Sequence, residues 1–248
     1  MKKLLAVIFL LPIYINAVEF LVSPPKLEFD LIRRNIVNDS LIVVNRDSNN
    51  ITIKCYFKDW GYKNGKKYYT KPGSLSYSAS HWITVNPLQF ELLPYEKRII
   101  RITLTKPDTV YKGEYRSMIF FETIAKPSSY SNMFMFNARI GVPLYAEMGR
   151  KEYIGFIEGI KYNENEIDLL YVNYSYNRLY LNGNYLIINE KNDTIINDSI
   201  RNILVLSRDT QNISVDIGNV EKGEYKVMFY IDNGGNEIAG GKKRFVKK

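Results

Sequence analysis

The sequence has few of the residues that most catalytic and metal sites need. It contains one cysteine, Cys55, and one histidine, His81, in 248 residues. A single cysteine excludes an intramolecular disulfide, and one residue of each type is too few for a structural zinc site. A Ser-His-Asp arrangement would have to use His81, which stands beside Trp82 at the start of an expected strand. We therefore expect no enzymatic activity, no cofactor and no metal, and an enzymatic alternative would require a polar cleft around His81.

Long apolar runs are also lacking after the N-terminus. Two lysines precede an apolar segment over residues 4–14, and Ala17 ends a candidate cleavage site. The segment is too short to span a membrane as a helix. We expect a signal peptide over residues 1–17, export to the periplasm and no membrane insertion. An uncleaved anchor is the alternative, because Ile15 is bulky for a cleavage motif.

The charges show no strong concentration. The formal net charge is +8, and basic residues gather only at Lys66-Lys67 and in the C-terminal residues 242–248. A basic protein can meet nucleic acid or acidic membranes. An exported protein rarely meets nucleic acid, so we interpret the charge as a solvated surface and expect no nucleic-acid partner.

One stretch occurs twice. Residues 112–121 begin Lys-Gly-Glu-Tyr, and residues 222–231 begin with the same four residues. The offset is about the length of one immunoglobulin-like domain. In both copies a glycine opens a tight corner, a tyrosine follows two residues later, and a run of strand-forming residues comes next. We interpret the copies as the same late strand in two tandem β-sandwiches.

The rest of the chain has the pattern of an all-β protein. Short alternating or apolar runs recur between turn signals, as in residues 98–104, where Ile100, Ile102 and Leu104 share one face. Cys55 lies in phase with apolar neighbours in another such run, which predicts a buried cysteine. Paired prolines at 24–25 imply an edge strand or a switch between sheets.

Two connecting stretches set the limits of the expected domains. Residues 59–80 are polar, which predicts a long loop that leaves the sheets. Residues 146–152 are small and charged, which predicts the boundary between the two domains. The expected domains are residues 18–147 and residues 153–248. The second would close with a hairpin at the Asn-Gly-Gly-Asn turn over 233–236.

The most informative strand is expected over residues 133–144. Most of its apolar side chains alternate onto one face, which can pack on a core. Two methionines make the opposite face apolar as well. Either the strand is central and buried on both faces, or it is an edge that offers a free ladder to another chain. The side chains of interest are Met133, Phe134, Met135, Phe136, Ala138 and Ile140.

In order and spacing, the first domain resembles the N-terminal domain of the periplasmic pilus (fimbrial) chaperones, the PapD-like family. The matching segments lie at residues 23–29, 41–45, 82–87, 90–94, 98–102, 113–117 and 139–140. Together they cover most of residues 20–146. The second domain is similar to the family's smaller C-terminal sandwich, mainly through Gly223-Glu224-Tyr225 and the closing hairpin.

The resemblance implies a boot-shaped pair of immunoglobulin-like sandwiches that completes a pilus subunit with its long strand. Phe134 and Phe136 would enter the groove of the subunit. The family also uses two cations to hold the carboxylate at the subunit's C-terminus. Lys26 stands at the first of these positions, and Gly141, which has no side chain, stands at the second. Lys26 and Arg139 are therefore the candidate carboxylate anchor.

The implied partners are pilus or surface-fibre subunits and an outer-membrane assembly platform, with self-association through the edge strand as a further expectation. A structural or adhesive secreted protein, in which both domains are spacers, is the alternative. In that case the long strand should be fully paired inside its own sheet.

Overall fold

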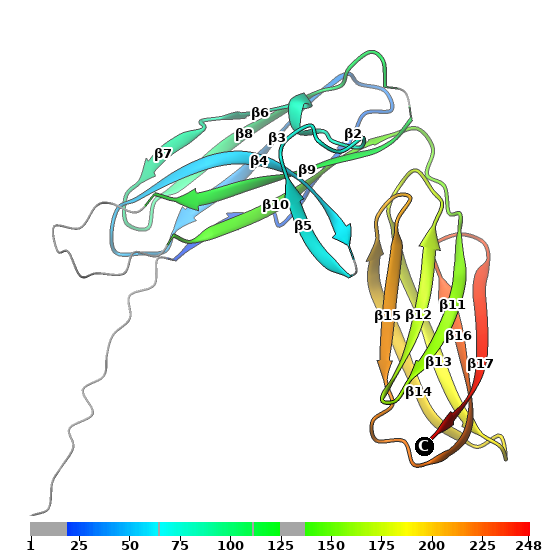
Figure 1. Ribbon diagram of the computed structural model, residues 1–248. Coiled ribbons are helices and arrows are strands. Elements are labelled where there is room, and N and C mark those ends of the chain that lie inside the picture. Colours follow the sequence, from blue (N-terminus) through cyan, green and yellow to red (C-terminus); the bar gives the residue numbers. More distant parts are fainter. Residues whose placement is uncertain (1–18, 64, 111, 125–136) are drawn as a thin grey trace, which may run out of the picture.

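The computed structural model describes residues 19–63, 65–110, 112–124 and 137–248. The expected signal peptide, and residues Met133, Phe134, Met135 and Phe136 of the expected long strand, lie outside these ranges. Within them, no helix is long and apolar enough to cross a membrane. The fold is all-β and consists of two tandem sandwiches, as the sequence predicts. The two sandwiches are arranged in an L (Figure 1).

The first sandwich consists of two sheets. One has the order β1 (Phe20–Ser23), β3 (Ile36–Asn45), β8 (Lys97–Thr105) and β6 (Ile83–Asn86). The other has the order β2 (Leu27–Asp30), β10 (Arg139–Met148), β9 (Gly113–Thr123), β4 (Ile51–Lys63) and β5 (Lys66–Thr70), and β7 (Gln89–Leu92) also pairs with β4. A short 3₁₀ turn, η1 (Ser80–Trp82), precedes β6.

The second sandwich is smaller. Its first sheet has the order β11 (Gly155–Asn163), β12 (Glu166–Asn173) and β15 (Thr210–Asp216). Its second sheet has the order β14 (Thr194–Val205), β13 (Leu179–Asn189), β16 (Gly223–Asp232) and β17 (Ile238–Lys247). The predicted Asn-Gly-Gly-Asn turn joins β16 to β17, which pair from Asp232 opposite Ile238 onward. Strand β11 was not expected from the sequence.

Each sandwich encloses its own apolar core. In the first domain the alternation along β8 places Ile100, Ile102 and Leu104 inside, all fully buried. Cys55 is buried in the same core, as predicted, and burial raises the pKa of its thiol to about 12. The second core gathers around Tyr171 and Phe229. Separate cores mean that each domain is stabilised mainly by its own packing.

An asparagine plays the same part in both sandwiches. The side-chain amide of Asn45, at the end of β3, donates to the carbonyls of Asn49 and Leu93. The amide of Asn173, at the end of β12, donates to the carbonyls of Asn177 and Leu206. Both asparagines are fully buried. The two domains therefore share a hydrogen-bonded corner as well as a strand pattern.

The repeated Lys-Gly-Glu-Tyr stretch opens β9 and β16, as expected. Gly113 and Gly223 both have positive φ values, +108° and +159°, a region that L side chains rarely adopt. Tyr115 then packs against Trp82, with ring centroids 4.5 Å apart, and Tyr225 stacks on Phe245 at 5.6 Å. Each tyrosine therefore joins the start of its strand to a neighbouring element.

Residues 59–80 were predicted to form a long polar loop, but part of this stretch is a β-hairpin. β4 continues to Lys63 and β5 pairs back on it, so the first part is a hairpin that extends the sheet. The buried carboxylate of Asp59 orders the second part. It accepts hydrogen bonds from the hydroxyls of Ser78 and Ser80 and from the backbone of Leu75. Polar side chains in this stretch therefore satisfy one another inside the fold.

Candidate functional site: the edge of strand β10

Strand β10 is paired on one side along its whole length and on the other side along only part of it. It runs antiparallel to β9 from Arg139 to Met148. It runs parallel to β2 only from Leu144 to Glu147. Within the described residues, the segment 139–143 therefore has a neighbouring strand on one side only. This segment is a sheet edge that another strand could join.

The proline pair explains why β2 begins only at Leu27. β1 pairs with β3 in one sheet, whereas β2, immediately after Pro24-Pro25, pairs with β10 in the other. A proline lacks the N–H that a ladder needs. The prolines were predicted to mark an edge strand or a switch between sheets, and both are observed, because β1 and β2 are edge strands of different sheets. The switch leaves the first half of β10 uncovered.

The predicted contact residues that fall in the described part are Ala138 and Ile140. Both are half-buried, and both pack against the core of the first domain. They share a phase with Val142 and Leu144, which are buried in that core. The backbone amide of Ala138 donates to the hydroxyl of Thr123 at 2.9 Å. The chain is thus held against β9 just before β10 begins.

The two candidate anchor residues lie apart. The Lys26 ammonium is 2.9 Å from Glu28 and faces the ring of Tyr180 at 5.6 Å. The guanidinium of Arg139 lies 5.0 Å from the centroid of Phe120. Lys26 precedes Leu27, which lies opposite Leu144 in a parallel ladder. Lys26 is therefore level with Pro143, four residues along β10 from Arg139, which is about 13 Å at the usual rise of a strand. The structure does not bring the two cations together.

Gly141 has a packing reason to lack a side chain. A Cβ at this position would lie 2.8 Å from Cε1 of Phe120 and 3.2 Å from Sδ of Met118. Phe120 is only 4% exposed, so its ring fills the space beside the strand. The space that a side chain at this position would need is therefore taken by the ring of Phe120.

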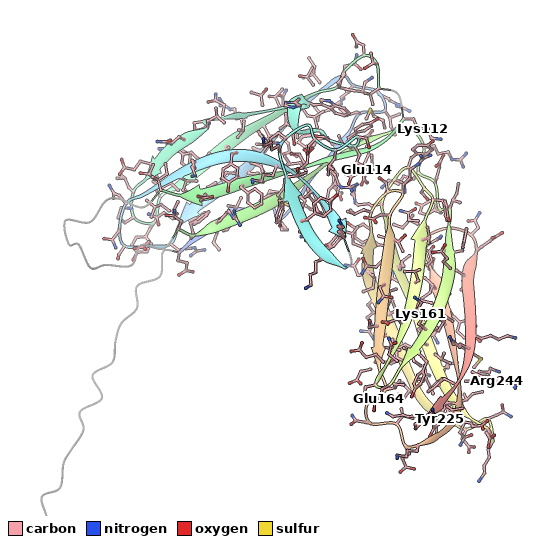
Figure 2. All side chains as sticks on the ribbon, in the orientation of Figure 1. Lys112, Glu114, Lys161, Glu164, Tyr225 and Arg244 are labelled. Carbon is pink, nitrogen blue, oxygen red and sulfur yellow. The ribbon has the colours of Figure 1, made fainter. Side chains whose placement is uncertain are left out.

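A buried arginine stands at the junction of the two domains, and sequence reasoning missed it. Arg178, just before β13, forms ion pairs with Glu114 at 2.5 Å, with Glu147 at 2.9 Å and with Glu28. Its guanidinium also lies 3.9 Å from the ring centroid of Tyr145. All of these partners belong to the first domain, and Figure 2 shows Glu114 where that domain meets the second. Arg178 therefore ties the domains together.

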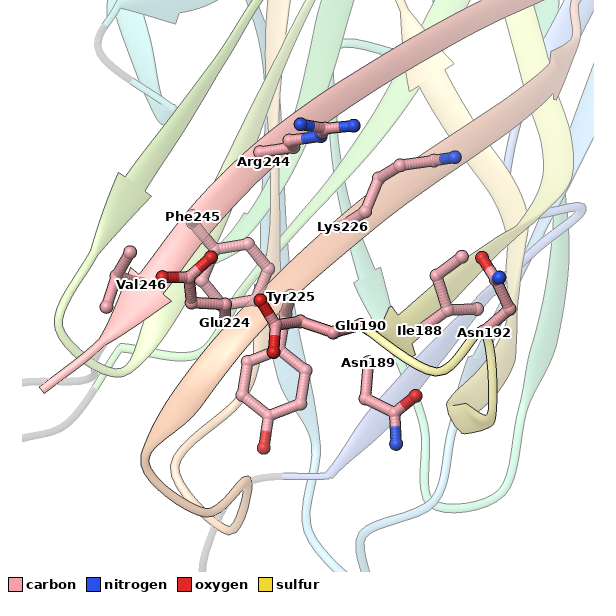
Figure 3. Close-up of a pocket in the computed structure, with 10 residues that line it drawn as sticks. All are labelled: Ile188, Asn189, Glu190, Asn192, Glu224, Tyr225, Lys226, Arg244, Phe245 and Val246. Carbon is pink, nitrogen blue, oxygen red and sulfur yellow. The ribbon is translucent and has the colours of Figure 1, made fainter.

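His81 and the hollow in the second domain show no comparable set of polar contacts. His81 is exposed and lies over Gly73, where a Cβ would be 2.2 Å from its Nε2. An open hollow of about 360 Å³ lies at the far end of the second domain (Figure 3). It is lined by Glu190, Glu224, Lys226 and Arg244 among others, so both signs of charge face it. Among the described residues, no group of histidine, cysteine or acidic side chains is placed to hold a metal.

Comparison with known proteins places the fold. No protein-family model matches the sequence, and no curated protein sequence matches it. Solved structures do match over almost the whole chain. The class 5 fimbrial chaperone CfaA is 16% identical, with a TM-score of 0.54 over 91% of this chain and 98% of that one. A chain of the CsuC–CsuE chaperone–tip subunit complex from Acinetobacter baumannii is 12% identical, with a TM-score of 0.51 over 91% and 98%.

A chain from the SafA pilin–SafB chaperone complex of Salmonella enterica is 10% identical, with a TM-score of 0.50 over 94% of this chain and 98% of that one. The sheets and the open β10 edge define a two-domain, immunoglobulin-like β protein. More narrowly, the chain has the fold of the fimbrial chaperones, which confirms the expected resemblance at the level of the fold.

Proposed function

We propose that this protein is a periplasmic chaperone of pilus or other surface-fibre subunits. It would bind a subunit by strand complementation along residues 132–144. The observation that carries the proposal is the segment 139–143 of β10, which has a described neighbour on one side only, in a chain with the fold of fimbrial chaperones. A spacer protein would gain nothing from leaving such an edge unpaired.

The side chains that would enter the subunit are Phe134 and Phe136, which continue the phase of Ala138 and Ile140. Met133 and Met135, on the other phase, would give the strand a second apolar face. In a complex, backbone hydrogen bonds along the ladder supply affinity, and alternate side chains supply specificity. The same edge would permit self-association of the free protein.

The subunit's C-terminal carboxylate would be held by Lys26 or by Arg139. Because about 13 Å of strand separates their positions, each is proposed as an independent anchor. Lys26 already pairs with Glu28, and Arg139 already interacts with Tyr56 and Glu122, so either cation would exchange a present partner for the new carboxylate.

Other parts of the proposal follow from the same family likeness. The chain would divide into a signal peptide over 1–17 and domains over 18–147 and 153–248, supported by the two separate cores. The exported protein would act without catalysis and without a cofactor. It would deliver its subunit to an outer-membrane assembly platform.

The test is co-purification of the full chain from the periplasm, with partners identified by mass spectrometry. We expect a small β-rich fibre subunit with the unaltered protein and its loss from the F134D/F136D variant. Ile99→Asp, on an exposed position of β8 in the other sheet, is the matched control and should retain the subunit. Hydrogen exchange should also slow at the β10 amides of the complex. Unchanged subunit binding by F134D/F136D would refute the proposal.

A further inference from the structure

The second domain exposes a group of large apolar side chains near its start. They come from three segments that are far apart in the sequence: the linker and the start of β11, the loop after β12, and the start of β17. We call this surface the outer corner; it consists of Tyr153, Ile154, Phe156, Tyr174 and Ile238, which are 46–67% exposed. Large apolar side chains that gather on one surface mark a contact site more often than single ones do.

Contacts within the outer corner make it one continuous surface. The rings of Phe156 and Tyr174 stack with their centroids 5.0 Å apart. The backbone amide of Tyr174 donates to the carbonyl of Ile154 at 2.8 Å. A groove beside the stacked rings is lined by Tyr153, Phe156 and Ile238, together with the glycines of the β16–β17 turn. The apolar residues therefore present a single face to a partner.

The two walls of this groove carry unpaired charges of opposite sign. One wall is the linker, with Arg150, and the other leads into β17, with Glu237. Both side chains are exposed, and neither forms an ion pair with a residue that the structure describes. Lys151, beside Arg150, is instead 3.2 Å from Glu147. Such a surface is complementary to itself, because a two-fold axis brings the carboxylate of each copy to the cation of the other.

The outer corner lies apart from the β10 edge. β11 and β15 are the opposite edges of one sheet, and β15 lies beside the tip of the β4–β5 hairpin of the first domain. β11 lies on the far side, with β17 (Figure 1). Along β10, five residues separate Pro143, at the end of the open segment, from Met148, which is about 16 Å at the usual rise of a strand. A partner at the outer corner would leave the segment 139–143 free.

The size of the outer corner fits a small symmetric contact. A buried aromatic residue covers about 150–250 Å², so five large side chains that are roughly half exposed present on the order of 400 Å² of apolar surface per copy. With the polar walls included, two copies would bury about 1,200 Å², which is the lower limit for a specific interface. An interface of this size is expected to be reversible, with an affinity in the micromolar range.

We propose that the outer corner is a dimer contact between two copies of this chain related by a two-fold axis. Phe156 and Ile238 of each copy pack on the apolar surface of the other. Arg150 of each copy meets Glu237 of the other. The contact involves neither β10 nor a subunit, so it is independent of the proposed function. The dimer carries two open β10 edges and can hold two strands at once.

Sedimentation velocity of the full chain, purified from the periplasm, measures the contact. Between about 1 and 200 µM, the mass should rise from that of one chain toward that of two and stop there, because a two-fold contact closes. F156D/I238D should stay monomeric throughout. L88D/I99D, which changes two comparably exposed residues of the first domain, is the matched control and should still dimerise.

A charge exchange tests the pairing of Arg150 with Glu237. Arg150→Glu alone and Glu237→Arg alone should each weaken dimerisation at least about fivefold, because the repulsion occurs twice in a two-fold dimer. R150E/E237R should restore the affinity to within about twofold. A constant mass, a mass that rises beyond that of two chains, or a double exchange no better than the single ones would overturn the inference. Loss of the dimer in F134D/F136D would also overturn it, because the contact would then lie at the β10 edge.

Discussion

The guanidinium of Arg178, in the second domain, donates to the carboxylate of Glu114, in the first, at 2.5 Å. The two side chains are 4% and 0% exposed. Burial opposes ionisation of Glu114 and raises the pKa of its carboxyl, although Arg178 acts in the opposite direction. A charge pair in such surroundings is stable only while both partners are present. The junction between the domains therefore depends in part on this contact.

Replacing Arg178 by methionine should destabilise the junction by about 3–5 kcal/mol, because Glu114 would remain buried without a counter-charge. Urea unfolding of the full chain measures the change. Arg208→Met is the control: Arg208 also lies 3.9 Å from a tyrosine ring, that of Tyr176, but it is exposed, so the loss should stay below about 1 kcal/mol. Equal losses in the two variants would contradict the role given to Arg178. Adding Glu114→Gln to Arg178→Met should recover part of the loss.

Asp59 should make stability depend on pH. Burial opposes its ionisation, but hydrogen bonds from Ser78, Ser80 and Leu75 outweigh burial and hold its pKa below the ordinary value of 3.8. The charged form therefore stabilises the fold above about pH 4, and this contribution is lost as pH falls through the lowered pKa. Asp59→Asn should cost about 1–3 kcal/mol at neutral pH.

Urea midpoints measured from pH 6 down to pH 2.5 test this dependence. The Asp59→Asn variant should lose less stability between pH 4 and pH 2.5 than the unaltered protein. Asp108→Asn, in an exposed loop, is the matched control. Parallel profiles for Asp59→Asn and the unaltered protein would show that the hydrogen bonds to Asp59 do not favour its charged form.

Much of the fold could be predicted because strand alternation is a local signal. The pattern of β8 alone indicates which side chains are inside, and the repeated Lys-Gly-Glu-Tyr stretch marks the same corner in both domains. The proline pair predicts a change of sheet because a missing N–H acts at its own position. These features can be predicted without knowing which distant residues they contact.

The candidate site was less accessible from sequence because its key contacts join distant residues. Arg178 meets Glu28, 150 residues away in the chain, and no local pattern indicates that pairing. The polar stretch 59–80 reads as a loop because its serines face Asp59 only in the folded chain. The open side of β10 depends on where β2 begins, which the spacing of residues along β10 does not indicate.

Cys55 should be inert to thiol reagents in the native protein. Burial raises the pKa of its thiol to about 12, so almost no thiolate exists at pH 8, and the side chain is 6% exposed. Labelling with a disulfide reagent at pH 8 should therefore require unfolding and should be complete in urea. The rate at which Cys55 is labelled in the native protein should increase with any substitution that destabilises the first domain. Rapid labelling of the native protein would contradict the burial of Cys55.

Restoring a side chain at Gly141 should harm the first domain, because the ring of Phe120 occupies the space. We expect Gly141→Ala to cost about 1–3 kcal/mol in urea unfolding, since its Cβ would lie 2.8 Å from Cε1 of Phe120. The cost should shrink in a Phe120→Leu background, which removes that ring atom. Gly240→Ala is the control, because a Cβ there meets nothing within 4 Å, and it should be neutral or slightly stabilising. An equal cost for Gly141→Ala in both backgrounds would show that Phe120 is not what requires glycine at this position.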